Sequence, residues 1–490
     1  MKVIKNNIAY AIGSAANSLA LFLLIPYLVN ALPTEEYGAW ALFEVAVVFL
    51  NMLILAGMDT GLMREYWFLD GEEERHRLSG TVLIGTLGWG LVIVGVSSLG
   101  LWVGAGYLQV VEILQFGSST NLLALVVFIG FFEAIFALLL SLFRIREEAW
   151  RFVVLSVGRM FLFLVATIVG VSWLEGVEGA LLGRLVAGIF GVAVAAFLAR
   201  NLVALQFTPG RFKRVVRYGL PLLPTSIAAY VLFASDRYVM DYFYSLEVVA
   251  VYSFAYKVAT TVDVLITRPF AIDWAPRRFK IATQDNPQHR YAQALLLYLF
   301  AGVGFALLVI AGTPLVYVLI DPPDSFYAGM HLIPLLLTAY LIYGLSYPLN
   351  IGIMLKDKTE LLPLLSGSAA VICIVLNILW ISRFGMVGAA WATIVAYAFH
   401  TAALAWFSQR FYPIKYSLRP FVVIIIAGTV AYGGIYGAGQ LLGSDSILVS
   451  SLIQSAWTFL IWTGVAYLLW GEQLSSLLRP RVHTIVGSGQ

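Results

Sequence analysis

Charged side chains stand inside several apolar segments of this sequence, where they could bind an anion within a membrane. Residues 231–244, VLFASDRYVMDYFY, place Asp236 beside Arg237, with Asp241 one helical turn later. Three more cations lie in apolar segments: Arg159, Arg184 and Lys257. A charge near the bilayer centre costs about 2.5–3.5 kcal/mol on insertion scales, so it needs a partner or a function. Because guanidinium groups bind phosphate oxygens bidentately, the pattern indicates either buried ion pairs or a passage for a phosphate-bearing molecule.

The composition identifies an integral membrane protein. Of the 490 residues, 61% are hydrophobic and 12% are charged, whereas a soluble domain has about 25% charged residues. The formal charge of +3 is too small to indicate a nucleic-acid-binding protein. Cys373 is the one cysteine and the five histidines are scattered, which argues against an intramolecular disulfide and a zinc site. We therefore expect no cofactor, and the lack of a nucleotide-binding loop argues against ATP hydrolysis.

Hydropathy predicts an all-α polytopic membrane protein with fourteen transmembrane helices. A spanning helix needs about 20 mainly apolar residues. The first candidate is interpreted as an uncleaved helix and not a signal peptide, because its apolar run of about 22 residues has no convincing cleavage site. The candidates are residues 8–30, 38–60, 79–103, 121–143, 152–174, 178–200, 218–244, 248–268, 292–320, 330–355, 361–382, 386–408, 420–441 and 447–470.

The distribution of basic residues predicts how these helices are oriented. With both termini in the cytoplasm, twenty-five of the 30 lysines and arginines fall in cytoplasmic segments. Arg383 alone falls in an outer loop, and four cations lie inside spans. Cytoplasmic loops carry an excess of Lys and Arg, so we expect a multi-pass protein of the cytoplasmic (inner) membrane with both termini on the cytoplasmic side.

An internal repeat relates two groups of six helices. GVEGALLGRLVAGIF at 176–190 and GMVGAAWATIVAYAF at 385–399 share small residues and Phe at an offset of 209. An offset of six helices preserves orientation, which is the parallel-repeat arrangement of transporters whose halves rock about a central site. The alternative is convergent packing of small residues, since Gly and Ala recur wherever membrane helices approach closely.

The predicted organisation is two six-helix lobes followed by an additional helix pair. The N-lobe covers residues 1–200 and the C-lobe covers 218–408, with spans 13 and 14 and a cytoplasmic tail in 409–490. Residues 201–217 join the lobes. Their apolar residues alternate with four basic ones, so we expect a short amphipathic helix on the inner leaflet that serves as anchor and hinge.

Several motifs resemble Wzx-type polysaccharide flippases of the multidrug/oligosaccharidyl-lipid/polysaccharide (MOP) exporter superfamily. They are ALPTEEYGAWAL after the first span, GMDTGLMREY after the second, YGLPLLPTSIAAYVLFASDRYVMDYF and YSFAYKVAT in spans seven and eight, and FGMVGAAWAT in span twelve. The resemblance covers nearly the whole chain. Its most specific parts are Ser-Asp-Arg-Tyr at 235–238 and the motif at 385–393.

The resemblance implies a function that composition and periodicity do not supply. It implies translocation of an undecaprenyl-pyrophosphate-linked oligosaccharide from the inner to the outer leaflet, by alternating access to a central cationic cavity. Such transport would serve surface or exopolysaccharide synthesis, with a polysaccharide polymerase or export assembly as a further expected partner.

The charged residues give a set of candidate substrate contacts. Cations at staggered depths suit a phosphate-bearing head group, so we expect Arg237 and Lys257 to face the passage, with Arg184 and Arg159 as further candidates. On one helix face, Arg237 and Asp241 are four residues apart and are expected to pair. Asp236 points about 100° away and is expected to tie its helix to a neighbour. A sugar-binding surface would use aromatic residues, and the candidates are Tyr230, Tyr252 and Tyr256.

The remaining charges are expected to have structural or gating roles. Glu44 and Glu133 are interpreted as partners of the buried cations, with coupling to a proton or sodium gradient as the alternative role. Asp59 and Arg64 lie at the inner end of the second span, where they would form a cytoplasmic gate or anchor.

Two other classes of function compete with this interpretation. A lipid II or multidrug exporter of the same superfamily would share the fold, although a drug exporter would need a cation site led by acidic residues. A membrane glycosyltransferase or polysaccharide polymerase would need a sizeable outer loop, and the predicted outer loops are short. We therefore expect a transporter and not an enzyme.

Overall fold

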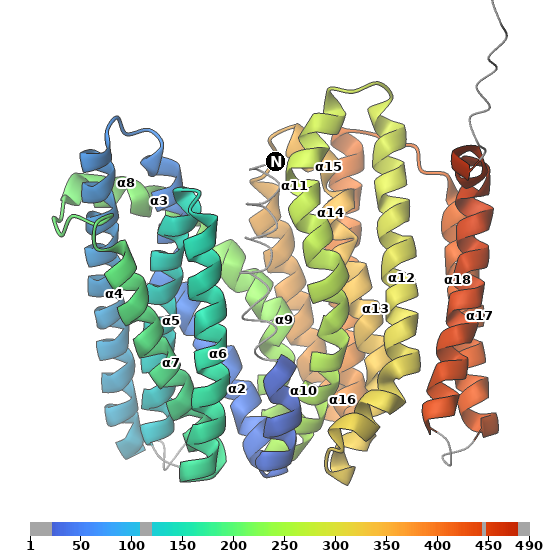
Figure 1. Cartoon of the computed structure of the whole chain (residues 1–490), viewed down its shortest axis with the longest axis horizontal. Coiled ribbons are helices and arrows are strands. Elements are labelled where there is room, and N and C mark those ends of the chain that lie inside the picture. The colour runs from blue at the N-terminus through green and yellow to red at the C-terminus, as the bar shows by residue number, and fades with distance from the viewer. Residues whose placement is uncertain (1–21, 108–119, 443–446, 479–490) are drawn as a thin grey trace, which may run out of the picture.

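The structure is a computed structural model that describes residues 22–107, 120–442 and 447–478, and within them the protein consists of helices and connecting loops (Figure 1). Twelve helices in this part of the chain are long and apolar enough to cross a membrane. The prediction of an all-α polytopic membrane protein is confirmed. Most of the first predicted span, 8–30, lies outside the described residues, apart from an apolar helix at Phe22–Ala31.

One of the twelve helices contains two of the predicted spans. Helix α16, Leu361–Phe411, has 51 residues, and its backbone leaves helical geometry at Gly385, where φ is 56° and ψ is −137°. At 1.5 Å per residue a straight helix of this length would reach about 77 Å, far beyond a hydrocarbon core of about 30 Å. The backbone of Gly388 lies against Trp380. The chain therefore turns back at Gly385, which separates the predicted spans 361–382 and 386–408.

The first bundle contains the helices up to residue 199. They are α2 (Thr34–Leu55), α3 (Met58–Tyr66), α4 (Glu72–Tyr107), α5 (Thr120–Ile145), α6 (Ala149–Leu174) and α7 (Gly176–Ala199). Helices α6 and α7 form a tight antiparallel pair, because Gly170 and Gly179 bring their backbones into contact. Gly176, with φ of 78°, makes the turn between them.

The linker forms α8 (Pro209–Gly219), which packs against α3 and α4 at the end of the bundle that carries the basic loops. Val215 is buried there, and the Arg211 guanidinium lies 3.1 Å from a Glu74 carboxylate oxygen. A 3₁₀ turn, η1 (Leu220–Leu222), leads into α9. We call this end, uppermost in Figure 1, the inner end.

The second bundle contains the helices from α9 to α16. Besides α16 they are α9 (Leu223–Phe243), α10 (Leu246–Val262), the π-helix η2 (Asp263–Thr267), α11 (Arg268–Ala282), α12 (Pro287–Ile320), the 3₁₀ helix η3 (Asp324–Leu332), α13 (Ile333–Gly344), α14 (Ser346–Leu349) and α15 (Ile351–Leu355). Helix α9 packs along α16, and α10 packs against α13.

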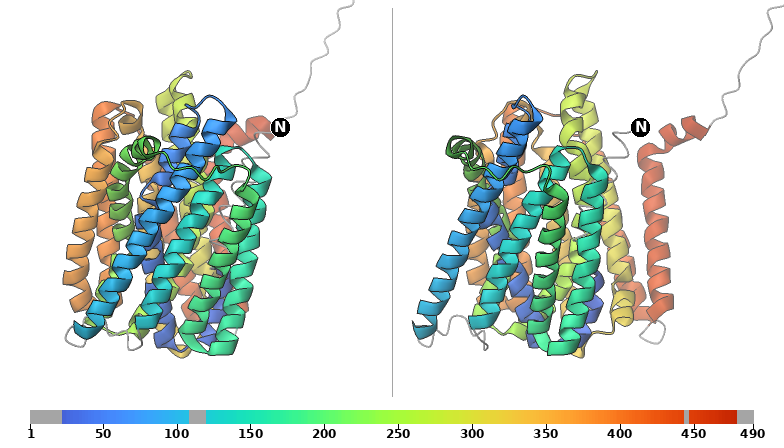
Figure 2. Two further views of the ribbon diagram at one scale, coloured as in Figure 1. Left: turned by 90° about the vertical axis from the view of Figure 1, so that its left-hand side faces the viewer. Right: turned by 60° about the vertical axis from the view of Figure 1, so that its left-hand side comes forward.

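The last two helices, α17 (Leu418–Leu442) and α18 (Ile447–Leu478), attach to the outside of the second bundle (Figure 2). They pack on each other and on α12, where the Trp462 indole donates a hydrogen bond of 3.0 Å to the Phe300 carbonyl. The predicted lobe boundaries at 200, 218 and 408 stay a prediction. The matched glycines of the repeat, Gly176 and Gly385, both have positive φ at a turn between antiparallel helices.

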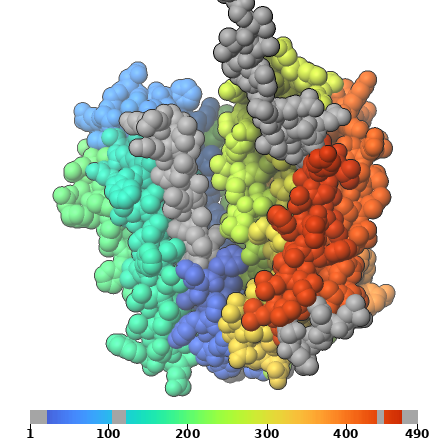
Figure 3. All heavy atoms as spheres, turned by 45° about the vertical axis from the view of Figure 1, so that its right-hand side comes forward, coloured from blue at the N-terminus to red at the C-terminus, as the bar shows by residue number. Residues whose placement is uncertain are grey.

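The two bundles meet most closely at the outer end, through α2 and α10. The backbone of Gly38 lies against the Leu246 carbonyl, and the Tyr37 ring packs edge-on against Phe326 at 5.7 Å. The Asn30 amide nitrogen donates a 2.7 Å hydrogen bond to the Ile320 carbonyl. In the space-filling view the blue N-terminal residues accordingly lie against the yellow end of α12 (Figure 3). Together these contacts join the bundles around a shared apolar core.

Candidate functional site

A cavity of about 410 Å³ lies between the two bundles and contains most of the predicted substrate-binding residues. Three helices each present one face to it, with side chains spaced three or four residues apart, as helical geometry requires. From α2 these are Ala41, Glu44, Val45 and Val48; from α9, Tyr230, Phe233, Ala234 and Arg237; and from α10, Ser253, Tyr256, Lys257 and Thr260. The remaining lining residues are Arg184, Asp263, Arg268 and Tyr340.

Lys257 and Glu44 form an ion pair across the cavity. The Lys257 ammonium lies 2.8 Å from a Glu44 carboxylate oxygen. Glu44 belongs to α2 in the first bundle and Lys257 to α10 in the second. The pair is therefore a charged contact between the bundles; Glu44 lies beside a cation as predicted, and its role stays a prediction.

Arg237 faces the cavity, but its charged partner differs from the predicted one. Its guanidinium lies 3.8 Å from an Asp236 carboxylate oxygen and stacks on the Tyr256 ring at 4.1 Å. The predicted Arg237–Asp241 pair is wrong, because among the described residues the Arg237 ion pair is made with Asp236. Successive side chains leave a helix about 100° apart, but an arginine side chain is long enough to fold back towards its sequence neighbour.

Asp236 ties α9 to α10, as expected of it. One carboxylate oxygen accepts a 2.6 Å hydrogen bond from the Tyr252 hydroxyl, and the other accepts the Arg237 backbone N–H at 2.9 Å. Tyr252 is fully buried and does not line the cavity, so its predicted contact with a sugar has no support from the geometry. Tyr230 and Tyr256 do line the cavity.

Glu133 joins two of the predicted cations in a buried triad. The Arg159 guanidinium lies 3.0 Å from a Glu133 oxygen, and the Arg184 Nε lies 2.9 Å from the same oxygen. Arg184 also lines the cavity, where its Nη1 has no hydrogen-bond partner among the described residues. Arg159 does not line the cavity. The predicted pairing of Glu133 is confirmed, and Arg159 acts on the cavity only through Glu133.

Asp263 and Arg268 reach the inner part of the cavity, although the sequence placed Arg268 in a cytoplasmic segment. The Arg268 Nε lies 2.7 Å from an Asp263 carboxylate oxygen. The two residues are five apart and are separated by one turn of π-helix, in which residues i and i+5 come together. A signal was available, because Ser253, Tyr256, Lys257, Thr260 and Asp263 recur at helical spacing.

Three other predicted residues lie away from the cavity. Asp59 and Arg64 are on α3 at the inner end, where the Arg64 guanidinium stacks on the Tyr218 ring at 4.5 Å. Their predicted role as gate or anchor stays a prediction. Asp241 is half-buried near the C-terminal end of α9 and does not line the cavity. Among the described residues, no group of three or more His, Cys, Asp or Glu side chains is placed to hold a metal ion.

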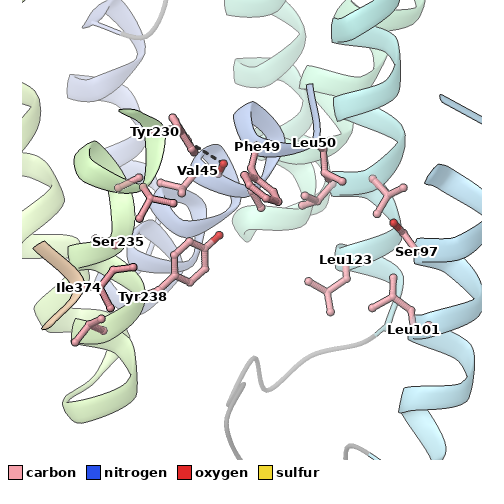
Figure 4. Close-up of a pocket in the computed structure, with 17 residues that line it drawn as sticks. Val45, Phe49, Leu50, Ser97, Leu101, Leu123, Tyr230, Ser235, Tyr238 and Ile374 are labelled. Carbon is pink, nitrogen blue, oxygen red and sulfur yellow. Dashed lines mark hydrogen bonds between the residues drawn. The ribbon is translucent and has the colours of Figure 1, made fainter. Parts of the chain in front are cut away.

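A second, larger cavity of about 710 Å³ adjoins the first (Figure 4). Val45, Tyr230 and Ala234 line both cavities. Figure 4 shows the Tyr230 hydroxyl donating a 2.8 Å hydrogen bond to the Val45 carbonyl, which places this pair between the two spaces. The rest of the second cavity is lined from α2, α4, α5, α9 and α16.

Comparison with known families shows which family the chain belongs to. The model of the family described as "Polysaccharide biosynthesis protein" matches residues 3–281, more than half of the chain. The chain belongs to this polysaccharide biosynthesis protein family. That match includes α2, α9 and α10, which supply most of the cavity's lining.

One protein is similar to this family member in sequence and one solved structure is similar to it in fold. A Haemophilus influenzae protein named "Lsg locus putative protein 1" is 21% identical over 275 residues, which are 54% of this chain. The matched region spans 63% of that relative, less than two thirds of its length. The solved structure "Lipid II flippase MurJ, inward closed conformation" is similar with a TM-score of 0.76 at 16% identity, covering 94% of this chain and 99% of that one.

Multidrug transporters of the MATE family share the fold at greater distance. An outward-facing structure described as a MATE family transporter of the MOP superfamily has a TM-score of 0.58 at 14% identity, and it covers 85% of this chain and 96% of that chain. These likenesses show that this multi-pass membrane protein shares the fold of the two solved structures. The resemblance seen in its sequence motifs is confirmed at the level of the polysaccharide biosynthesis protein family.

Proposed function

We propose that this protein moves an undecaprenyl-pyrophosphate-linked oligosaccharide from the inner to the outer leaflet of the cytoplasmic membrane. The observation that carries the proposal is the charge of the cavity between the bundles. Four cations and two carboxylates line it, and with the ion-paired Asp236, Glu133 and Arg159 directly behind them the formal charge is +1. A pyrophosphate head group complements that charge. Arg237 and Lys257 face the cavity from different helices, and each makes one ion pair.

Arg237 and Arg184 can bind phosphate without loss of the ion pairs that hold them. The Arg237 guanidinium is 3.8 Å from Asp236 and donates one long hydrogen bond of 3.3 Å to the Phe233 carbonyl. Both distances exceed the 2.7–2.9 Å of a strong charge-assisted hydrogen bond, so most of its donors can still bind a ligand. Arg184 keeps Nη1 free of a partner among the described residues while its other donors hold Glu133. Phosphate oxygens would satisfy these donors and so recover part of the cost of burying them.

Transport follows from alternating access between the bundles. The outer end is closed by the contact of α2 with α10, whereas Asp263 and Arg268 line the cavity towards the inner end and Arg268 is exposed. With both termini in the cytoplasm, as the basic loops predict, this is the state that receives substrate from the inner leaflet. Rocking of the bundles about the linker would then expose the cavity to the outer side.

The charge of the cavity separates this proposal from one of its rivals. A positive cavity repels the cations that a multidrug exporter with an acidic site would carry. A lipid II exporter, the activity named for the MurJ structure, stays the alternative, and the glycan arms of the experiment distinguish the two. Coupling to a proton or sodium gradient is a further proposal that the same experiment tests.

The test is flipping of undecaprenyl-pyrophosphate-linked oligosaccharide in proteoliposomes, with and without an imposed proton or sodium gradient and with lipid II as the second substrate. Arg237→Gln and Lys257→Gln should each lower the flipping rate about tenfold or more, because a charge-assisted hydrogen bond contributes about 1.5–3 kcal/mol. Arg237→Lys should recover part of the rate, since an ammonium keeps the charge without the bidentate fork.

Arg144→Gln is the matched control, because Arg144 is an exposed arginine at the inner end of α5 that does not line the cavity. It removes the same charge and should leave the rate within about twofold, a change below 0.5 kcal/mol as expected for an exposed site. Equal loss in all three variants, or no loss in any, would contradict the proposal. Faster flipping of lipid II than of the oligosaccharide lipid would favour the alternative.

A further inference from the structure

The larger cavity differs from the cationic one in chemistry although the two share a wall. Six of the residues that line the cationic cavity are charged, whereas none of the 17 that line the larger one is. Three of its four polar side chains, those of Tyr230, Ser235 and Tyr238, are already engaged by the protein. The Tyr238 hydroxyl donates to the Leu42 carbonyl, and Ser235 accepts a hydrogen bond from the Asn377 amide. To a ligand the larger cavity therefore presents an apolar surface.

The shared wall gives the two cavities a common boundary. It consists of Val45 on α2 with Tyr230 and Ala234 on α9, and the Tyr230 hydroxyl is held by the Val45 carbonyl. A molecule with an anionic head in the cationic cavity would thus have an apolar space directly beside its head. A lipid whose charged head is bonded directly to its apolar chain needs a polar and an apolar site side by side.

We propose that the larger cavity, which we call the tail cavity, holds the first part of the substrate's isoprenoid chain while the pyrophosphate lies in the cationic cavity. This proposal rests on the proposed function and deepens it. An apolar cavity of about 150 Å³ holds a benzene molecule, so a cavity of 710 Å³ holds several isoprenoid units. The chain would pass between α4 and α5 of the first bundle and α9 and α16 of the second, whose side chains form the cavity.

The position of the tail cavity gives the chain a role in transport. It is lined from both bundles, so rocking of one bundle against the other must change its shape. A bound chain therefore contacts both bundles at the same time as the head does. Selectivity for a long isoprenoid chain over a short one would arise here, because a short chain leaves most of the apolar surface uncovered.

Helix α4 offers a matched pair of variants to test the tail cavity. Gly100 lines it and Gly95 does not. A Cβ atom built on either glycine meets none of the atoms considered within 4 Å, so a side chain can start from both positions without a clash at Cβ. Five residues apart, they point about 140° away from each other. Gly100→Trp fills the tail cavity, and Gly95→Trp adds the same bulk on another face.

The experiment measures binding of undecaprenyl pyrophosphate and farnesyl pyrophosphate to the full-length protein in detergent. We expect the wild-type protein to bind the undecaprenyl compound at least tenfold more tightly. Gly100→Trp should abolish that preference, and Gly95→Trp should keep it. Retention of the preference by Gly100→Trp, or its loss in both variants, overturns the proposal. Lys257→Gln should weaken binding of both compounds equally, and if it weakens neither, the proposed function fails independently of the tail cavity.

A second measurement needs no variant. Undecaprenyl pyrophosphate carrying a diazirine near its head should, on illumination, label residues of α4, α5 and α9 in the wild-type protein. Labelling confined to α12, α17 and α18 would overturn the proposal. Equal labelling of the tail cavity by a diazirine phosphatidylglycerol would assign it to ordinary membrane lipid, which also overturns the proposal.

Discussion

Gly38 is the position at which a single methyl group should change the conformational equilibrium of this protein. It lies on α2 at the outer contact between the bundles, and a Cβ atom there would come within 2.0 Å of the Leu246 carbonyl oxygen and 3.3 Å of the Ala250 nitrogen, both on α10. Real Cβ atoms keep about 3.4 Å or more from such neighbours. Gly38→Ala therefore requires α2 and α10 to separate by roughly 1.4 Å at this point.

The magnitude follows from the cost of overpacking. Inserting a methyl group into a close contact costs about 1–3 kcal/mol. Only the state closed at the outer end bears this cost, because the contact is broken when the outer end opens. The gain in helix propensity from Gly to Ala applies equally to both states and cancels. A difference of about 1–3 kcal/mol shifts the ratio of outward-open to outward-closed protein by about 5–150-fold.

The assay is labelling of a cysteine inside the cationic cavity. Thr260→Cys in a Cys373→Ala background places one thiol on α10 in the cavity lining. A membrane-impermeant maleimide is added from the outer side of oriented vesicles. In the otherwise unchanged protein the thiol should react slowly from this side, and Gly38→Ala should raise the rate by the factor above.

Gly95→Ala is the control, since a Cβ atom at Gly95 meets nothing within 4 Å. It should leave the labelling rate unchanged. An unchanged rate in a folded Gly38→Ala protein, checked by its yield and melting temperature, would refute the idea that this contact closes the outer end. Faster labelling in both variants would show a general loosening of the helices instead of an opening.

Three further predictions concern the buried charges. Glu133→Ala should lower the stability of the folded protein by about 3–5 kcal/mol, because it leaves two guanidinium groups unneutralised in the first bundle. Thermal unfolding in detergent measures this loss, and the yield of folded protein should fall with it. Arg184→Ala should keep a folded protein, since Glu133 retains its other arginine, but should slow flipping about tenfold; a melting temperature as low as that of Glu133→Ala would contradict this. Exchange of Lys257 and Glu44 should restore the melting temperature lost in Lys257→Glu alone, and failure to do so would show that the pair does not hold the bundles together.

The all-α architecture and the approximate positions of most spans could be predicted because the bilayer fixes the length of an apolar helix. The sequence also predicted which cations are buried, since charges stand out in apolar segments. The partner of Arg237 could not be predicted in the same way. The i, i+4 rule compares residues on one helix, whereas the Asp236 carboxylate is held partly by Tyr252, a residue of another helix. The triad around Glu133 likewise depends on three helices packing together.

The depth of a residue along its helix was also difficult to predict from the sequence. Counting residues at 1.5 Å each assumes regular α-helix, and the π-helix after Val262 breaks that assumption. It brings Arg268 back towards Asp263 and into the cavity lining. The cavity-facing pattern of α10 was nevertheless present in the sequence as polar residues at helical spacing. Such a polar pattern cannot be distinguished from an ordinary helix–helix interface until α2 and α9 are known to line the same cavity as α10.

The buried charges fall into two groups that must behave differently when the bundles rock. The Glu133 triad lies within the first bundle, and the contact of Asp236 with Tyr252 lies within the second, so both survive a rigid rotation of one bundle against the other. The Lys257–Glu44 pair joins the two bundles and cannot survive such a rotation unchanged. Separating it leaves a buried ammonium without a partner, which is costly in a medium of low dielectric constant. A substrate phosphate bound to Lys257 would replace Glu44 and remove that cost, so that the loaded protein could rock more easily than the empty one.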